Sequence, residues 1–132
     1  MRTLYRRLLL ESRPRQWARW LRQGARHVSR PGRYPVLGSF FVTYRCNHFC
    51  DMCPTHETDR EVRGPRGKEP GTDRMLALVD QMVDLGVLGI GFTGGEPLLR
   101  KDLDALVRRA AARGVLVHLN TNGFLLDDAS LV

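Results

Sequence analysis

The chain has 132 residues, of which 42% are hydrophobic and 27% are charged, a balance typical of one globular domain with a buried core. No apolar run reaches the about 18 residues that a membrane-spanning helix needs. The leucine run at residues 8–10 is too short for the hydrophobic region of a signal peptide. We therefore expect a protein of the reducing cytoplasm.

The formal charge of +7 is concentrated at the N-terminus. Residues 1–34 hold ten arginines and a single acidic residue, whereas residues 35–132 hold 11 basic and 13 acidic residues. A nucleic-acid-binding domain more often has its basic surface on the folded body, so no specific nucleic-acid partner is expected. The sequence thus divides into a basic helical N-terminal arm, residues 1–34, and a body, residues 35–132.

The arm has the pattern of one or two amphipathic helices, interrupted at Pro14, with Trp17 and Trp20 on the apolar stripe of the second. One interpretation is peripheral membrane contact through residues 1–30, with the tryptophans at the interface and the arginines on anionic lipid. The other is that the stripe packs on the body. We favour packing, because basic amphipathic helices are common and rarely diagnostic.

The body alternates strands and helices. Strands are predicted at residues 39–45, 87–92 and 115–120, and helices at residues 73–85, with Asp73 as the N-cap, and 102–113. Residues 54–72 between the first strand and the first helix are polar and rich in Gly and Pro, which indicates a lid or a disordered loop. The order of elements and the near-continuous apolar strands predict an α/β fold with two βαβ units and a parallel sheet.

Unusual residues follow all three predicted strands. Residues 46–53 follow the first strand, TGGEP (residues 93–97) follows the second, and NTNG (residues 120–123) ends the third. In parallel sheets, functional residues gather at the carboxyl ends of the strands. We therefore expect these three segments to form one site.

All the cysteines lie within eight residues, at Cys46, Cys50 and Cys53. An odd number of clustered thiols is a poor disulfide framework, and thiolates bind zinc or iron–sulfur clusters. A structural zinc would need His48 or His56 to complete a Cys3His site. Thiols at i, i+4 and i+7 can instead reach three corners of an iron–sulfur cubane and leave its fourth iron open.

The C-x3-C-x2-C motif directly after the first strand, with Gly94-Gly95-Glu96-Pro97 after the second, resembles the radical S-adenosylmethionine (SAM) enzymes. The resemblance covers residues 39–126, and the NTNG end of the third strand is similar to the subgroup of molybdenum-cofactor and peptide-modifying enzymes. It implies a parallel βαβαβ portion of a partial (βα)6 TIM-like barrel, preceded by the arm. Because the later strands are absent, we expect a truncated N-terminal half of the core domain, and catalytic competence stays open.

The resemblance also implies a mechanism. Cys46, Cys50 and Cys53 would hold a [4Fe–4S] cluster whose open iron is chelated by SAM, and the reduced cluster would cleave SAM to a 5′-deoxyadenosyl radical. The radical would take hydrogen from an unknown substrate, and a flavodoxin- or ferredoxin-type protein would supply the electron. No catalytic residue beyond the cluster ligands is assigned.

The predicted SAM-binding residues lie on the same three segments. Gly94 and Gly95 allow close approach of backbone to a ligand, Pro97 biases Glu96 towards an extended conformation, and the Glu96 carboxylate would suit the SAM ammonium group.

Four further residues have weaker assignments. Met52 stands where the family most often has an aromatic residue near the adenine, and methionine can pack there. Asn120 and Asn122 are candidates for contact with SAM or substrate, although asparagine also simply tolerates the left-handed backbone of a turn. His118 on the third strand could point into the barrel or pack against a helix, and we favour ordinary packing.

Two other classes of protein stay open alongside the radical enzyme. One is a zinc-binding interaction module with a Cys3His site. The other is a basic protein that binds a membrane or a nucleic acid through the arm, whose binding would be sensitive to salt.

Overall fold

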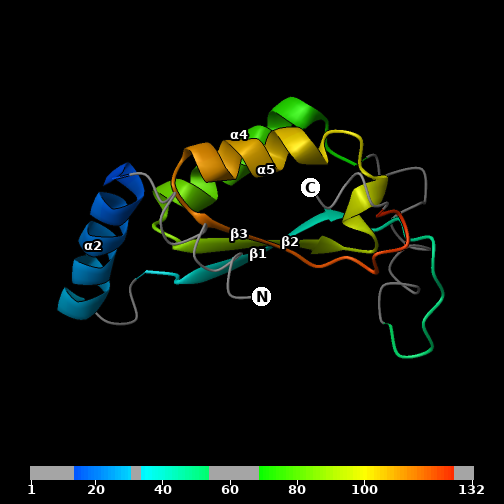
Figure 1. The fold of residues 1–132 in the computed structure, drawn as a ribbon, viewed down its shortest axis with the longest axis horizontal. Coiled ribbons are helices and arrows are strands. Elements are labelled where there is room, and N and C mark those ends of the chain that lie inside the picture. Colours follow the sequence, from blue (N-terminus) through cyan, green and yellow to red (C-terminus); the bar gives the residue numbers. More distant parts are fainter. Residues whose placement is uncertain (1–13, 31–33, 54–68, 127–132) are drawn as a thin grey trace.

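The computed structural model describes residues 14–30, 34–53 and 69–126 (Figure 1). The elements in chain order are α2 (Pro14–Ser29), β1 (Leu37–Thr43), α4 (Thr72–Asp84), β2 (Gly89–Gly94), the 3-10 helix η1 (Pro97–Leu99), α5 (Leu103–Ala112) and β3 (Leu116–Leu119). The predictions for residues 1–13, for most of the loop after the cysteines including His56, and for residues 127–132 lie outside the described residues.

The three strands form a parallel sheet in the order β1-β2-β3, with Ser39, Gly91 and His118 side by side. Both α4 and α5 lie on one face of this sheet (Figure 1). Since side chains alternate along a strand, every second residue points at the helices. These include Val42, Ile90 and Phe92, all buried in the core. The predicted α/β fold, a parallel βαβαβ portion of a TIM-like barrel, is confirmed.

The helices are held to the sheet by the apolar stripes seen in the sequence. Met75, Val79 and Val83 of α4 are buried, and Leu106 and Ala110 of α5 join them in the same cluster. The start of α4 differs from the prediction. Gly71 is the N-cap residue and makes no side-chain cap, so Asp73 instead lies in the first turn, where a carboxylate favours the positive end of the helix dipole.

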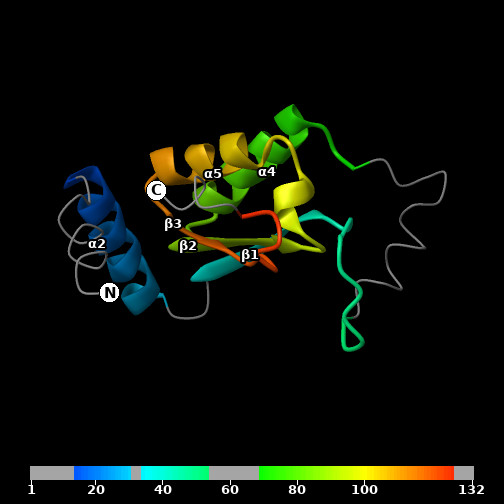
Figure 2. The ribbon, with the colours of Figure 1, turned by 45° about the vertical axis from the view of Figure 1, so that its right-hand side comes forward.

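Helix α2 packs at the amino ends of the strands, at the opposite end of the sheet from the cysteines (Figures 1 and 2). Arg19 donates to the carbonyl oxygen of Val83 at 2.9 Å, and the Trp20 indole donates to that of Gly114 at 3.3 Å. These carbonyls lie at or just beyond the ends of α4 and α5, where helices leave acceptors without partners. The arrangement agrees with the packing interpretation of the arm. Over the described ranges, no helix has the length and apolar character that crossing a membrane requires.

Candidate metal and cofactor site

The three unusual segments lie at the carboxyl ends of neighbouring strands. Cys46 comes three residues after the end of β1, Gly94 is the last residue of β2, and Asn120 directly follows β3. In both ribbon views, the segment after β3 lies beside η1, and the cysteine loop leaves the sheet at the same end (Figures 1 and 2). The fold therefore brings together residues that are more than 70 positions apart in the sequence.

The cysteine loop holds Cys46, Cys50 and Cys53, which form no disulfide with one another. Cys46 and Cys53 are half-buried, and Cys50 is exposed. The His48 N–H donates to the Cys46 sulfur at 3.4 Å, and the Cys53 N–H donates to the Cys50 carbonyl at 3.0 Å. Within the described part of the chain, no three Cys, His, Asp or Glu side chains converge closely enough to hold a metal ion. The three sulfurs therefore do not meet at one point.

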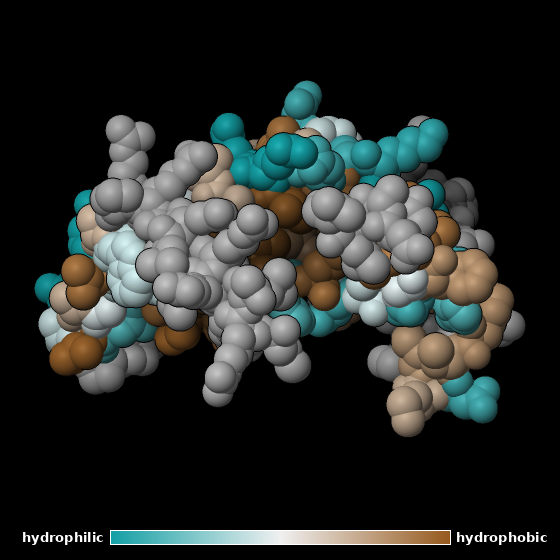
Figure 3. All heavy atoms as spheres, viewed as in Figure 1, coloured by the Kyte–Doolittle hydropathy of each residue, from teal (hydrophilic) through white to brown (hydrophobic). Residues whose placement is uncertain are grey.

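Two large apolar side chains of this loop are exposed. Phe49 is 88% exposed and Met52 is 92% exposed, so Met52 packs against no part of the described structure. In the space-filling view, tan surface projects at the lower right with some teal among it (Figure 3). Apolar side chains around a metal site limit solvent access and lower the local dielectric constant.

The two glycines of the GGEP turn are required by backbone packing. A Cβ on Gly94 would overlap the carbonyl oxygen of Thr43, and a Cβ on Gly95 would overlap that of Arg45. The Gly95 N–H donates to the Thr43 carbonyl at 2.9 Å, and Gly94 has a φ of +148°. Glycine therefore lets the end of β2 lie directly on the chain that leads into Cys46, which is a reason for both glycines besides close approach to a ligand.

Glu96 is extended, as predicted from the following Pro97, and its side chain is 0% exposed. One carboxylate oxygen accepts from the Leu98 N–H at 2.9 Å and from the Thr121 hydroxyl at 2.8 Å, and the other accepts from the Asn122 N–H at 2.8 Å. These partners belong to η1 and to the turn after β3. The contact with the SAM ammonium group stays a prediction, and the structure adds an internal role for this carboxylate.

The turn after β3 reaches the cysteine loop. The Asn122 side-chain amide donates to the Asn47 side-chain oxygen at 2.8 Å, and the rings of His48 and Phe124 meet edge to face with centroids 5.2 Å apart. Sequence reasoning missed Asn47 and Phe124. Neither stands in a periodic pattern, and the only signal for Asn47 was its position between two cysteines.

His118 and Asn120 lie on the face of the sheet opposite the helices. Both are exposed, and the His118 Nε2 atom lies 2.7 Å from the Asn120 side-chain oxygen. The expectation that His118 packs inside the fold is wrong, because strand alternation directs Val117 and Leu119, and not His118, towards α4 and α5. His118 and Asn120 thus form a polar pair on the face of the sheet that α4 and α5 do not cover.

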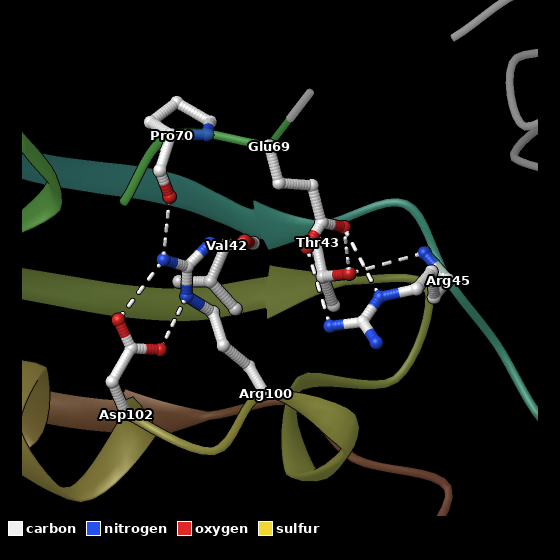
Figure 4. Close-up of polar contacts among 7 residues, drawn as sticks. All are labelled: Val42, Thr43, Arg45, Glu69, Pro70, Arg100 and Asp102. Atoms are coloured by element: carbon white, nitrogen blue, oxygen red, sulfur yellow. Dashed lines mark hydrogen bonds and ion pairs between the residues drawn. The ribbon is translucent and has the colours of Figure 1, made fainter. Parts of the chain in front are cut away.

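A polar network fastens the end of β1 to the start of α4 (Figure 4). The Arg100 guanidinium is buried, donates to the carbonyls of Val42 and Pro70 at 2.8 Å each, and forms an ion pair with Asp102 at 2.7 Å. The hydrogen bond from Arg100 lowers the pKa of Asp102, with burial acting in the opposite direction. Arg100 thereby joins three segments of the chain behind the cysteine loop.

Glu69 closes the same network. It accepts hydrogen bonds from Thr43 and Arg45, the residues just before Cys46 (Figure 4). Burial on its own raises the pKa of Glu69, but the hydrogen bonds from Thr43 and Arg45 outweigh burial, so the pKa lies below its ordinary value. A cavity of about 210 Å³ lies between this carboxylate, β1 and α4, with Phe40, Met75 and Leu78 in its wall.

The parallel βαβαβ sheet with a cysteine loop after its first strand defines the class of protein. A family model described as the Radical SAM superfamily matches residues 40–131, and the chain belongs to this superfamily. The resemblance indicated by the sequence motifs is confirmed.

Curated relatives are similar over about two thirds of this chain. They include a PqqA peptide cyclase from Granulibacter bethesdensis, 38% identical over 91 residues, which are 68% of this chain and 23% of the relative. A probable GTP 3′,8-cyclase from Halobacterium salinarum is 39% identical over 88 residues, 64% of this chain and 24% of the relative. An Fe-coproporphyrin III synthase from Methanosarcina barkeri is 37% identical over 86 residues, 65% of this chain and 21% of the relative. The chain thus spans about a quarter of the length of these relatives.

The donor set fits an iron–sulfur cluster. Soft thiolate ligands select such clusters or zinc, and three cysteines leave one iron of a [4Fe–4S] cluster without a protein ligand. A Cys3His zinc site drawn from the described residues would need the His48 imidazole, and that ring lies against Phe124. His56, the other histidine considered, lies outside the described residues.

Proposed function

We propose that this chain binds a [4Fe–4S] cluster through Cys46, Cys50 and Cys53, and that SAM binds beside it at the carboxyl edge of the sheet. The observation that carries the proposal is the shared edge. Three cysteines follow β1 at the same edge as the GGEP turn, in a chain that belongs to the radical SAM superfamily.

Gly94, Gly95, Glu96 and Pro97 form the proposed SAM-binding turn, with Asn120 on the neighbouring strand end and Met52 on the cysteine loop. A cluster held there would supply one-electron reduction of SAM to a 5′-deoxyadenosyl radical for hydrogen abstraction from substrate, and the electron would come from a flavodoxin- or ferredoxin-type donor. The protein's own part is to hold the thiols, to orient the turn and to surround the site with apolar side chains. The relatives' names point to different substrates, so no substrate is assigned.

The proposed compartment is the cytoplasm, because clustered cysteines outside disulfides and a low-potential cluster suit a reducing environment. We do not propose that the arm contacts a membrane. Trp20 and Arg19 of α2 bond to the body of the protein, and an interfacial helix would present its tryptophans to lipid.

The test is anaerobic reconstitution of the chain with iron and sulfide, followed by metal analysis, absorption and EPR spectroscopy. We expect four iron and four sulfide per chain, and a reduced-cluster EPR signal that changes when SAM is added. Uptake of one zinc by a colourless protein, with loss of zinc in a His48→Ala variant, would overturn the proposal in favour of a zinc module.

Two variants sharpen the result. Cys50→Ser removes one of the three proposed ligands from an exposed position, so the fold should persist while the iron content falls well below that of the unchanged chain. Gly91→Ala is the control, because its added methyl group meets only ordinary contact and lies away from the thiols. Equal iron in the Cys50→Ser variant and the unchanged chain would contradict the ligand assignment.

A further inference from the structure

A chain of hydrogen bonds runs from the buried centre of the sheet edge to the cysteine loop. It begins at Glu96, whose N–H donates to the Arg45 carbonyl at 2.8 Å and whose carboxylate holds the Asn122 N–H at 2.8 Å. Glu96 is 0% exposed, so this end of the chain is fixed inside the fold. The end of β2 therefore sets the position of the turn after β3.

The next link is the Asn122 side chain, whose orientation is determined by its neighbours. Its oxygen accepts from the Phe124 N–H at 3.0 Å, so its amide nitrogen points the other way and donates to Asn47 at 2.8 Å. The two asparagines are 75 positions apart in the sequence. The contact is thus a tertiary one that depends on both strand ends being in place.

The last link lies inside the cysteine loop. Asn47 stands directly between Cys46 and His48, and the His48 N–H donates to the Cys46 sulfur at 3.4 Å. The edge-to-face contact of His48 with Phe124 joins the same two segments a second time. Hydrogen bonds to ligating sulfurs are among the features that set the reduction potential of a cluster. A contact that fixes residues 47 and 48 therefore fixes the donor to Cys46.

We propose that Asn47 and Asn122 form a latch, anchored by buried Glu96, that holds the cysteine loop against the end of β3 and so positions the Cys46 thiol. The inference rests on the proposed function for its meaning, since the positioned thiol is a proposed cluster ligand. The two asparagines act through the loop and are positioning residues. Both are exposed, so changing them should leave the core intact.

The latch can be tested on metal-free, reduced protein, with no cluster and no substrate. The rate of labelling of each cysteine by iodoacetamide is measured by mass spectrometry, with the unfolded chain as reference. In Asn47→Ala and Asn122→Ala we expect the half-buried Cys46 to label about fivefold faster than in the unchanged chain, the factor that one hydrogen bond of ordinary net strength is worth. Cys50 is already exposed, and its rate should change little.

Carboxylate variants give a matched control. In Asn47→Asp the new carboxylate still accepts from the Asn122 amide, and in Asn122→Asp the Asn47 amide can turn and donate, so both single variants should label like the unchanged chain. The double variant N47D/N122D has two facing carboxylates and no donor. Because a carboxylate beside Cys46 also disfavours its thiolate, the double variant is compared with the single carboxylate variants, and it should label faster than either.

The outcomes separate the latch from the proposed function. Unchanged Cys46 labelling in the folded alanine and double variants would overturn the latch, whatever metal the protein binds. A protein that shows the labelling pattern but takes up no cluster would keep the latch and reject the proposed function. If both hold, the reconstituted alanine variants should lose iron to a chelator faster than Asn47→Asp does.

Discussion

The Thr121 hydroxyl donates to the buried Glu96 carboxylate at 2.8 Å, and this hydrogen bond joins the ends of β3 and β2. Glu96→Ala would leave this hydroxyl and two backbone N–H groups without their acceptor. Because each unsatisfied buried polar group costs about 1–3 kcal/mol, we expect the free energy of unfolding to fall by about 3 kcal/mol or more. Urea unfolding measures the change. Glu96→Gln keeps one oxygen and should lose roughly half as much, and a loss under about 1 kcal/mol in Glu96→Ala would contradict this role.

Arg100 is the second buried residue whose hydrogen bonds join segments of the chain at this edge. It is 6% exposed and serves two carbonyls and Asp102, so Arg100→Ala leaves a half-buried carboxylate and two carbonyls unpaired. Breaking a buried pair by removing one partner costs about 3–5 kcal/mol, which we expect as loss of unfolding free energy in urea. Arg108→Ala is the matched control. Its pair with Asp104 is exposed on both sides, at 79% and 72%, so solvent screens the pair and the unfolding free energy should hardly change.

The sequence predicted the order of strands and helices because their apolar spacing is local. It also predicted the shared edge of the site, since parallel strands place their carboxyl ends together. The strand limits were less accurate. β1 and β2 cover residues 37–43 and 89–94, whereas the predictions were 39–45 and 87–92. Val87 is apolar and buried but precedes β2, so apolar character alone does not mark where that strand begins.

What the sequence left out are contacts made by single polar side chains. Asn47 meets Asn122, and buried Glu96 holds Thr121, only after the sheet has formed. Helix α2 shows the same limit. The apolar stripe placed Trp17 and Trp20 together, yet Trp17 is 45% exposed and the polar Gln23 is 5% exposed against the body. Which face of such a helix is buried depends on the shape and polarity of the body against which it packs. The periodicity of the helix sequence alone does not predict this.

Acid should destabilise the fold through Asp102. Arg100 lowers the pKa of Asp102 in the folded protein, so the folded state holds this proton less tightly than the unfolded chain does. The stabilisation is present above the unfolded pKa of about 3.9 and is lost as pH falls through the lower folded pKa. We expect the unfolding free energy in urea to be steady from pH 7 to about 5 and to drop below about 4.

Asp102→Asn tests the source of that drop. The variant should be less stable at pH 7 and should show a shallower decline with acid, because one titrating group has been removed. Asp80 and Glu69, whose pKa values are also lowered, should account for the remaining slope. An acid profile identical to that of the unchanged chain would rule out Asp102 as a contributor.

The two glycines of the GGEP turn differ from a third glycine on the same strand. A methyl group on Gly94 or Gly95 would overlap a backbone carbonyl oxygen of the segment that leads into Cys46, whereas one on Gly91 would meet only the Gly38 oxygen at 3.9 Å. Gly94→Ala and Gly95→Ala should therefore lose at least about 1–3 kcal/mol of unfolding free energy, the usual cost of forcing extra atoms into packed structure. Gly91→Ala should be neutral or should gain up to about 1 kcal/mol, since alanine restricts the unfolded chain. Urea unfolding of the three variants measures the difference. Equal stability of all three would mean that the ends of β1 and β2 are less closely packed than described, and that the glycines serve only the ligand.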